Sequence, residues 1–153
     1  MKFKTILIAA CFLGCVTGSF AQEKKIKRED LPPAVEKTVA AESAGATIKG
    51  FSEEKENGQT FYEAELTVKG HSKDVLIDAT GTVVEVEEEV GLDKLPADVK
   101  AGLEAKAGKG KIGKVESLTK KGKLVAYEAH ITVNGKKSEV QVGPDGKPLD
   151  HEE

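Results

Sequence analysis

The sequence lacks an apolar run long enough to span a membrane. Its longest such run lies within residues 1–21 and is about 14 residues long, whereas a membrane-spanning helix needs about 20. Lys2 and Lys4 precede the run, and small residues stand at Ser19 and Ala21. This pattern is typical of a secretory signal peptide cleaved after Ala21. We therefore predict a periplasmic or secreted protein that has no integral membrane span.

Cysteine is equally scarce. The two cysteines, Cys11 and Cys15, both lie in the predicted signal peptide, so the mature chain has none. Disulfides, thiol catalysis and cysteine-ligated metals are thereby excluded for the mature protein. A lipoprotein would carry its lipid on one of these cysteines, but Phe12 is a poor first residue for such a motif ending at Cys15, and Cys11 follows too short an apolar run. We predict no lipid anchor.

Aromatic residues and a basic surface are also lacking. The sequence has no Trp, and the predicted mature chain keeps only Phe51, Phe61, Tyr62 and Tyr127 as aromatic residues. Cleavage removes two lysines and no acid, so the formal net charge changes from -3 to -5. Nucleic-acid binding draws most of its strength from Lys and Arg on phosphates. We therefore predict no nucleic-acid partner.

No set of residues typical of a catalytic site stands out. A Ser-His-Asp site needs a serine on a strained turn with a base within hydrogen-bond reach, and nothing in the sequence singles out such a serine. Of the three histidines, we interpret His71 as a turn residue and His151 as part of a free polar tail, whereas His130 belongs to a predicted strand. We predict a protein that is not an enzyme and needs no cofactor.

What the sequence does contain is an internal repeat. The stretch "YEAELTVKG" at Tyr62–Gly70 recurs as "YEAHITVNG" at Tyr127–Gly135, with six of nine positions identical. Weaker matches extend to both sides, at an offset of 64 residues before this stretch and 65 after it. Self-similarity over such a period indicates duplication of a supersecondary unit. We predict two tandem units, residues 31–90 and 91–153, after a mobile charged leader at 22–30.

Each predicted unit begins with a helix. After the Leu-Pro pairs at Leu31 and Leu95, apolar residues recur every three to five positions, which is typical of one buried stripe on a helix of about three turns. The residues assigned to this stripe are Val35, Val39 and Ala40 in the first unit, and Val99, Leu103 and Ala107 in the second.

Beyond each helix the apolar period changes to two, which is typical of strands with one buried face. Tyr62 and Tyr127 fall among the inward residues, as do Val75 and Ile77. The last strand of each unit is predicted in "TVVEV" and in "KPLD". We therefore predict an α+β fold in which each unit packs one N-terminal helix on a four-stranded antiparallel sheet.

The acidic stretch "EVEEEV" at residues 85–90 raises the question of a metal site, because calcium prefers carboxylate ligands. The strand alternation assigns Val84 and Val86 to the core and leaves the glutamates that follow at an exposed strand end and linker. We interpret them as solvent-exposed. Envelope metal binding or buffering, with calcium or zinc, remains the alternative function.

The order of Leu-Pro helix, strand, "YEAxxTVxG" strand, hairpin and Asp-Gly turn before a final strand resembles the PepSY-like family. It also resembles the β-lactamase inhibitor protein, itself a tandem of such units. The resemblance implies a secreted or periplasmic non-enzymatic domain, in some relatives an inhibitor of peptidases or lactamases. Those inhibitors clamp a partner with an aromatic-rich concave sheet, and some carry disulfides. This chain departs on both points, since Tyr62 and Tyr127 fall on the buried face.

The outward residues of the same strands form the predicted binding surface. They are mostly acidic, so we predict a basic protein or peptide partner in the cell envelope. One apolar residue, Leu76, stands among them as a candidate anchor inside a polar rim. The predicted partner-binding residues are Glu63, Glu65, Asp74, Leu76, Asp78, Glu128, His130, Glu139 and Gln141.

Overall fold

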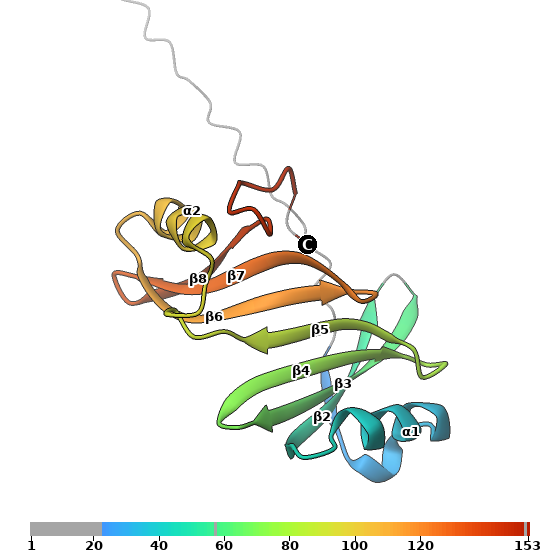
Figure 1. Cartoon of the computed structure of the whole chain (residues 1–153). Coiled ribbons are helices and arrows are strands. Elements are labelled where there is room, and N and C mark those ends of the chain that lie inside the picture. The colour runs from blue at the N-terminus through green and yellow to red at the C-terminus, as the bar shows by residue number, and fades with distance from the viewer. Residues whose placement is uncertain (1–22, 57, 152) are drawn as a thin grey trace, which may run out of the picture.

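The computed structural model describes residues 23–56, 58–151 and 153, so the predicted signal peptide and its two cysteines lie outside the described residues. The described chain is an α+β fold with one open antiparallel sheet of eight strands in the order β1 to β8 (Figure 1). The elements are β1 (Lys24–Ile26), η1 (Arg28–Asp30), α1 (Pro33–Glu42), β2 (Thr47–Glu56), β3 (Gln59–Val68), β4 (His71–Asp78), β5 (Val83–Glu89), α2 (Ala97–Ala107), β6 (Lys111–Lys120), β7 (Lys123–Val133) and β8 (Lys136–Val142).

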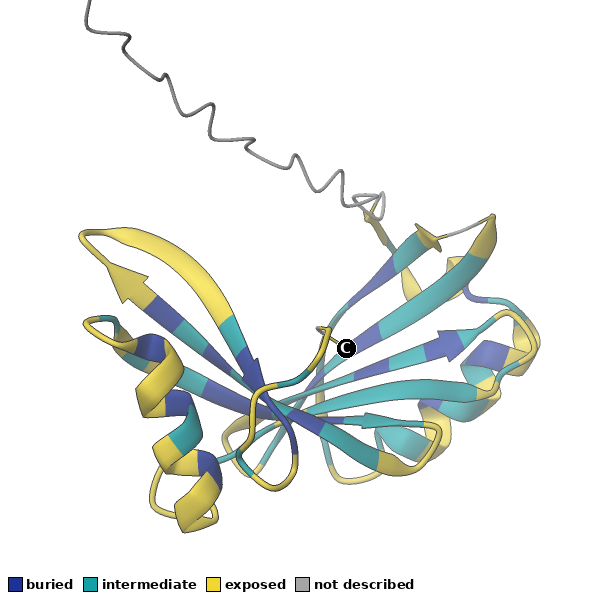
Figure 2. Cartoon of the chain, turned by 90° about the horizontal axis from the view of Figure 1, so that it is seen from above, coloured by how far each residue is buried: buried dark blue, intermediate teal, exposed yellow. Residues whose placement is uncertain are grey.

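Both α-helices lie on the same side of the sheet (Figure 2). Each begins directly after a proline. The amide groups at the start of a helix have no acceptor within the helix, so the missing N–H of proline costs no hydrogen bond there. The helical spacing predicted six buried residues, and five of them are the residues that the helices bury. The prediction was wrong for the sixth, Ala40, because its side chain is exposed. In the described ranges, the 10 residues of α1 and the 11 of α2 give neither helix the length or apolar composition of a membrane span.

The core forms two clusters between the helices and the sheet. One gathers α1 with β2, β3 and β4, and the other gathers α2 with β6, β7 and β8. Tyr62 and Tyr127, predicted to point inward, are partly buried and pack against these clusters. The completely buried members are Val35, Ala64, Val75 and Ile77 in the first cluster, and Val99, Leu103, Ala129 and Val142 in the second.

The two halves share one sheet, because β5 pairs with β6. Four strands follow α1 but only three follow α2, so the prediction of four strands in each unit was wrong for the second half. The predicted strand "KPLD" at residues 147–150 is irregular. Pro148 has no amide hydrogen to donate to a strand ladder, which explains this failure. The duplication itself stays a prediction.

The predicted mobile leader is partly folded onto the sheet. Residues Lys24–Ile26 pair with β2, and Ile26 packs against the first core cluster. Arg28 forms an ion pair with Glu36 of α1 at 2.7 Å. Backbone pairing along the sheet edge and the packing of Ile26 thus fix part of a segment that its charged composition alone predicted to be mobile.

A register shift between β4 and β5 corrects one further detail. Ile77 pairs with Val83 and Val75 pairs with Val86, with an irregularity between Leu76 and Ile77. A bulge of this kind inserts one residue and reverses the alternation beyond it. Val83 therefore packs against the core in the place predicted for Val84.

Candidate functional site

The sheet face opposite the helices is concave, and the helices cover its outer side (Figure 2). Residues directly opposite each other in antiparallel strands share a face. Cross-strand partners include Glu63 with Leu76 and Glu65 with Asp74 in one half. Glu128 with Gln141 and His130 with Glu139 are partners in the other half. With Asp78 opposite Phe61, the predicted site residues all project from this concave face.

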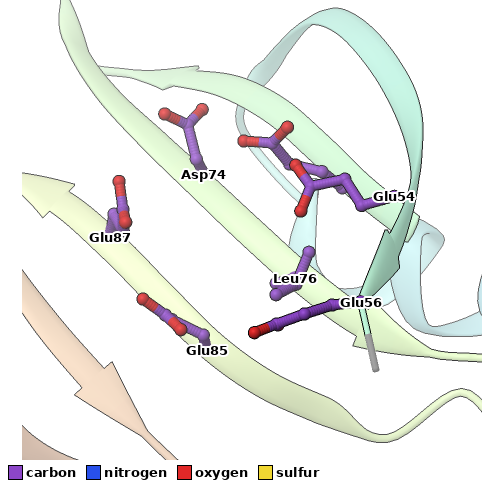
Figure 3. Close-up of a pocket in the computed structure, with 7 residues that line it drawn as sticks. Glu54, Glu56, Asp74, Leu76, Glu85 and Glu87 are labelled. Atoms are coloured by element: carbon purple, nitrogen blue, oxygen red, sulfur yellow. The ribbon is translucent and has the colours of Figure 1, made fainter. Parts of the chain in front are cut away.

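Six carboxylate side chains and Leu76 line a hollow of about 200 Å³ on the concave face of β2, β3, β4 and β5. The side chains point toward one another from neighbouring strands (Figure 3). Among the described residues, an ion pair reaches only one of these acids, Glu85, whose carboxylate lies 3.7 Å from Lys120 Nζ. We name this set the acidic hollow, and its residues are Glu54, Glu56, Glu63, Asp74, Leu76, Glu85 and Glu87.

Burial and like charges make ionisation in the acidic hollow costly. Burial, together with the charges of Glu116 and Glu85, raises the pKa of Glu87 to about 8. Burial and the charges of Glu63 and Glu116 raise the pKa of Asp74 to about 6. Burial also raises the pKa of Glu63, although the Ser52 hydroxyl donates to its carboxylate at 2.8 Å. The hollow therefore holds more carboxyl groups than the neighbouring cations could compensate if all of them were ionised.

Sequence reasoning missed the contribution of β5. Glu85 and Glu87 were predicted to lie at an exposed strand end, but β5 is central in the sheet, between β4 and β6. That prediction was wrong because it could not anticipate that β6 covers the free edge of β5. The alternation around Val86 carried the missing signal, since it places both glutamates on the face opposite this core residue.

Two predicted site residues have partners outside the acidic hollow. Glu65 forms an ion pair and hydrogen bond with Lys25 of β1. Asp78 Oδ1 accepts the backbone N–H groups of Thr80 and Thr82 at 2.8 and 3.0 Å, and these contacts help to lower the pKa of Asp78. Glu65 thus belongs to the edge of the face, and Asp78 closes a turn.

The other half of the face holds a second group of titratable residues on β6, β7 and β8. His130 Nε2 lies 2.8 Å from Glu116 Oε2 and 3.9 Å from Glu128 Oε1. His130 Nδ1 lies 3.2 Å from Glu139 Oε1, and Gln141 Nε2 donates to Glu128 Oε2 at 2.8 Å. Glu116 is only 1% exposed, yet sequence reasoning did not select it. The structure thus adds one buried carboxylate to four predicted residues.

The C-terminal end also reaches the concave face. The backbone N–H of Glu153 donates to Gln141 Oε1 at 2.8 Å, and its carboxylate lies 3.8 Å from Lys120 Nζ. The prediction of a free polar tail was therefore wrong for Glu153, although His151 within it is exposed as expected. The contacts come from the side chains of Gln141 and Lys120 on the sheet. The sequence alone does not indicate that these side chains lie near residue 153.

No protein-family model and no curated protein matches the sequence. The structure is similar to a BLIP-like protein from Bacteroides fragilis, with 21% identity, a TM-score of 0.56, and coverage of 76% of this chain and 81% of the other. A DUF2874 family protein from Bacteroides ovatus has 18% identity and a TM-score of 0.62 over 78% and 85% of the two chains. A proposed periplasmic protein from Bacteroides eggerthii has 17% identity and a TM-score of 0.64 over 78% and 86%. At these identities the likeness concerns the fold, and it supports the β-lactamase-inhibitor-like part of the predicted resemblance. The PepSY-like part stays a prediction.

Proposed function

We propose that the chain is a non-enzymatic binding protein of the periplasm that takes a basic protein or peptide on its concave face. The observation that carries this proposal is the acidic hollow, in which six carboxylates surround one leucine. The predicted signal peptide supports the location, as does the likeness in fold to a proposed periplasmic protein. The likeness to a BLIP-like protein supports a protein partner.

The geometry suits a lysine or arginine side chain. Such a side chain has an apolar stem and a charged end, so the stem can lie on Leu76 while the charged end meets carboxylates such as Glu63 and Glu87. Burial and, to a smaller extent, repulsion raise the pKa of Glu87 and of Asp74, and a cation in the hollow offsets the repulsion. Long-range attraction between the acidic face and a basic partner also speeds their encounter.

Isothermal titration with hexalysine, and with the same peptide acetylated on its side chains, tests the proposal. We expect the charged peptide to bind more tightly at about 0.02 M than at about 0.15 M salt, because screening weakens surface attraction. The acetylated peptide should bind at least roughly tenfold more weakly, a difference of about 1.4 kcal/mol.

Variants locate the binding. Glu63→Gln combined with Glu87→Gln removes two carboxyl groups that a bound cation would hold ionised and, because burial opposes ionisation of both groups in the free chain, should not destabilise the fold. Glu104→Gln is the control, since Glu104 is exposed on α2 at the opposite side of the sheet. The double variant should lose most of the affinity for hexalysine and the control should keep it. Equal binding by all three proteins would contradict the proposal.

A further inference from the structure

We propose that Glu116, Glu128 and His130 form a binding site for a divalent transition metal ion, zinc foremost, on the half of the concave face made by β6 and β7. This site shares no residue with the acidic hollow and does not depend on a basic partner, although a carboxylate oxygen of Glu116 lies within 4.8 Å of carboxylate oxygens of Asp74 and Glu87. One ligand atom from each of the three residues lies within 4.8 Å of the other two. We name these three residues the histidine site.

The strand register builds this site. Glu116 of β6 lies directly opposite Glu128 of β7, and His130 stands two residues further along β7 on the same face. Three side chains that can ligate a metal therefore come from two hydrogen-bonded strands, which fix their separation. Glu116 is buried, whereas Glu128 and His130 are partly buried, so the site opens toward solvent on one side.

In each of the three side chains, the oxygen or nitrogen that is not a proposed ligand atom has a polar partner nearby. Lys114 Nζ lies 2.7 Å from Glu116 Oε1, and Gln141 Nε2 donates to Glu128 Oε2 at 2.8 Å. Glu139 Oε1 lies 3.2 Å from His130 Nδ1, whereas His130 Nε2 and Glu116 Oε2 are hydrogen-bonded at 2.8 Å. A metal ion would displace the proton that these two atoms share, as metal binding to protein ligands releases protons. Metal ligands in proteins are commonly oriented by such outer contacts. The three atoms left to face one another are Glu116 Oε2, Glu128 Oε1 and His130 Nε2.

The ligand types select the metal. Calcium takes six to eight oxygen ligands, whereas imidazole nitrogen suits zinc, copper, nickel and iron. One nitrogen and two carboxylate oxygens leave a fourth, open position for water on zinc. A hollow of about 660 Å³, lined in part by Lys114, His130 and Glu139, adjoins the site at His130.

Charge also favours a dication here. Glu116 lies opposite Glu128, and the carboxylate of Glu139, opposite His130, adds a further negative charge 3.2 Å from the imidazole. The negative charge of Glu116 further helps to raise the pKa of Asp74 and of Glu87. Lys114 is the lysine that contacts Glu116 directly among the described residues. A divalent ion at the histidine site would lower the cost of these neighbouring charges.

Isothermal titration of zinc chloride into the chelator-treated full chain tests the site. We expect one zinc per chain, and at least a tenfold loss of affinity in His130→Gln, since a lost ligand should cost no less than a lost outer contact, which costs about 10–100-fold. The matched control is His71→Gln, because His71 also pairs with a glutamate, Glu89, at 3.5 Å. Glu128→Gln is a second variant that keeps the buried Glu116 intact.

The visible absorption spectrum of cobalt(II) reports the ligands bound to the ion, and a change in electrostatic attraction alone does not alter it. Cobalt bound to one nitrogen and two oxygens should show visible absorption bands that disappear in His130→Gln and persist in His71→Gln. Three results would overturn the site: no saturable zinc binding, equal zinc affinity in the His130 variant, or calcium binding as tightly as zinc. Each of these would mean that His130 serves only as an ion-pair partner of its glutamates.

Discussion

The two halves of the concave face hold carboxylates in similar places but compensate their charge differently. In the half made by β2–β5, Ser52 lies opposite Glu63 and gives it a hydroxyl hydrogen bond at 2.8 Å. In the half made by β6–β8, the buried Glu116 lies opposite Glu128 and contacts His130. Both Ser52 and Glu116 are almost completely inaccessible to solvent.

This difference teaches that one sheet geometry can present two kinds of cation site. A neutral serine leaves the first half with an open group of carboxylates beside Leu76, which suits the long side chain of a basic partner. A buried glutamate beside an imidazole gives the second half a nitrogen-containing ligand set, which suits a metal ion.

Core truncation should have the largest effect and tests whether the two halves fold as one unit. Leu66→Ala in the first cluster and Leu103→Ala in the second should each lower the free energy of unfolding by about 2–5 kcal/mol, the usual loss for a buried leucine. Because β5 pairs with β6, each variant should show a single urea transition. Two separate transitions, with only one displaced, would show that the halves unfold independently.

The acidic hollow should make stability depend on pH. The pKa of Glu87 is about 8 in the folded chain, against an ordinary value of 4.5, so between these values the folded state binds more protons than the unfolded state. The free energy of unfolding contributed by Glu87 is therefore complete below about pH 4.5 and is lost as the pH rises through about 8.

Thermal unfolding at about pH 6 and about pH 8.5, with a chelator present, measures this effect. We expect the higher Tm at the lower pH, and a smaller difference in Glu87→Gln. The Glu104→Gln control, exposed on α2, should behave like the parent. Carboxylates with a lowered pKa, such as Asp78, change charge below this range and do not reverse the sign. A parent that is more stable at the higher pH would contradict the electrostatic interpretation of the hollow.

The smallest expected effect concerns the N-terminal segment that joins the first half. Arg28→Ala removes a surface ion pair with Glu36, so the denaturation midpoint should hardly change. Chemical denaturation measures this change, with Lys27→Ala as the control, since Lys27 precedes the short helix η1 and pairs with Glu29 inside it. A large fall in the denaturation midpoint, unmatched by the control, would mean that this segment is a principal support of the sheet.

Much of the fold was predictable because alternation and helical spacing are local signals. The burial of Val75 and Ile77 followed from the period of two, and the face of Glu63 and Asp74 followed from the same count. The sequence could not indicate that β5 pairs with β6, because strand pairing depends on contacts far apart in the chain. Glu87 was misplaced for that reason.

Glu116 was missed for a different physical reason. The pairing of β6 with β7 shifts register between Ile112 and Val115 and again between Leu118 and Thr119. Each irregularity interrupts the period of two, so counting alternate residues does not assign a face along β6. His130 lies on the regular part of β7, and its face was therefore predicted correctly.

The most direct test of two distinct, adjoining cation sites is one NMR experiment on the isotope-labelled full chain. Hexalysine and zinc are titrated separately, and the backbone amide shifts are mapped onto the sheet. We predict that hexalysine moves the amides around Glu63, Leu76 and Glu87, whereas zinc moves those around Glu116 and His130. Glu116 lies within 4.8 Å of Asp74 and Glu87, so small shared shifts are expected at that border. The largest shifts at the same residues with both ligands would contradict the division of the concave face into an acidic hollow and a histidine site.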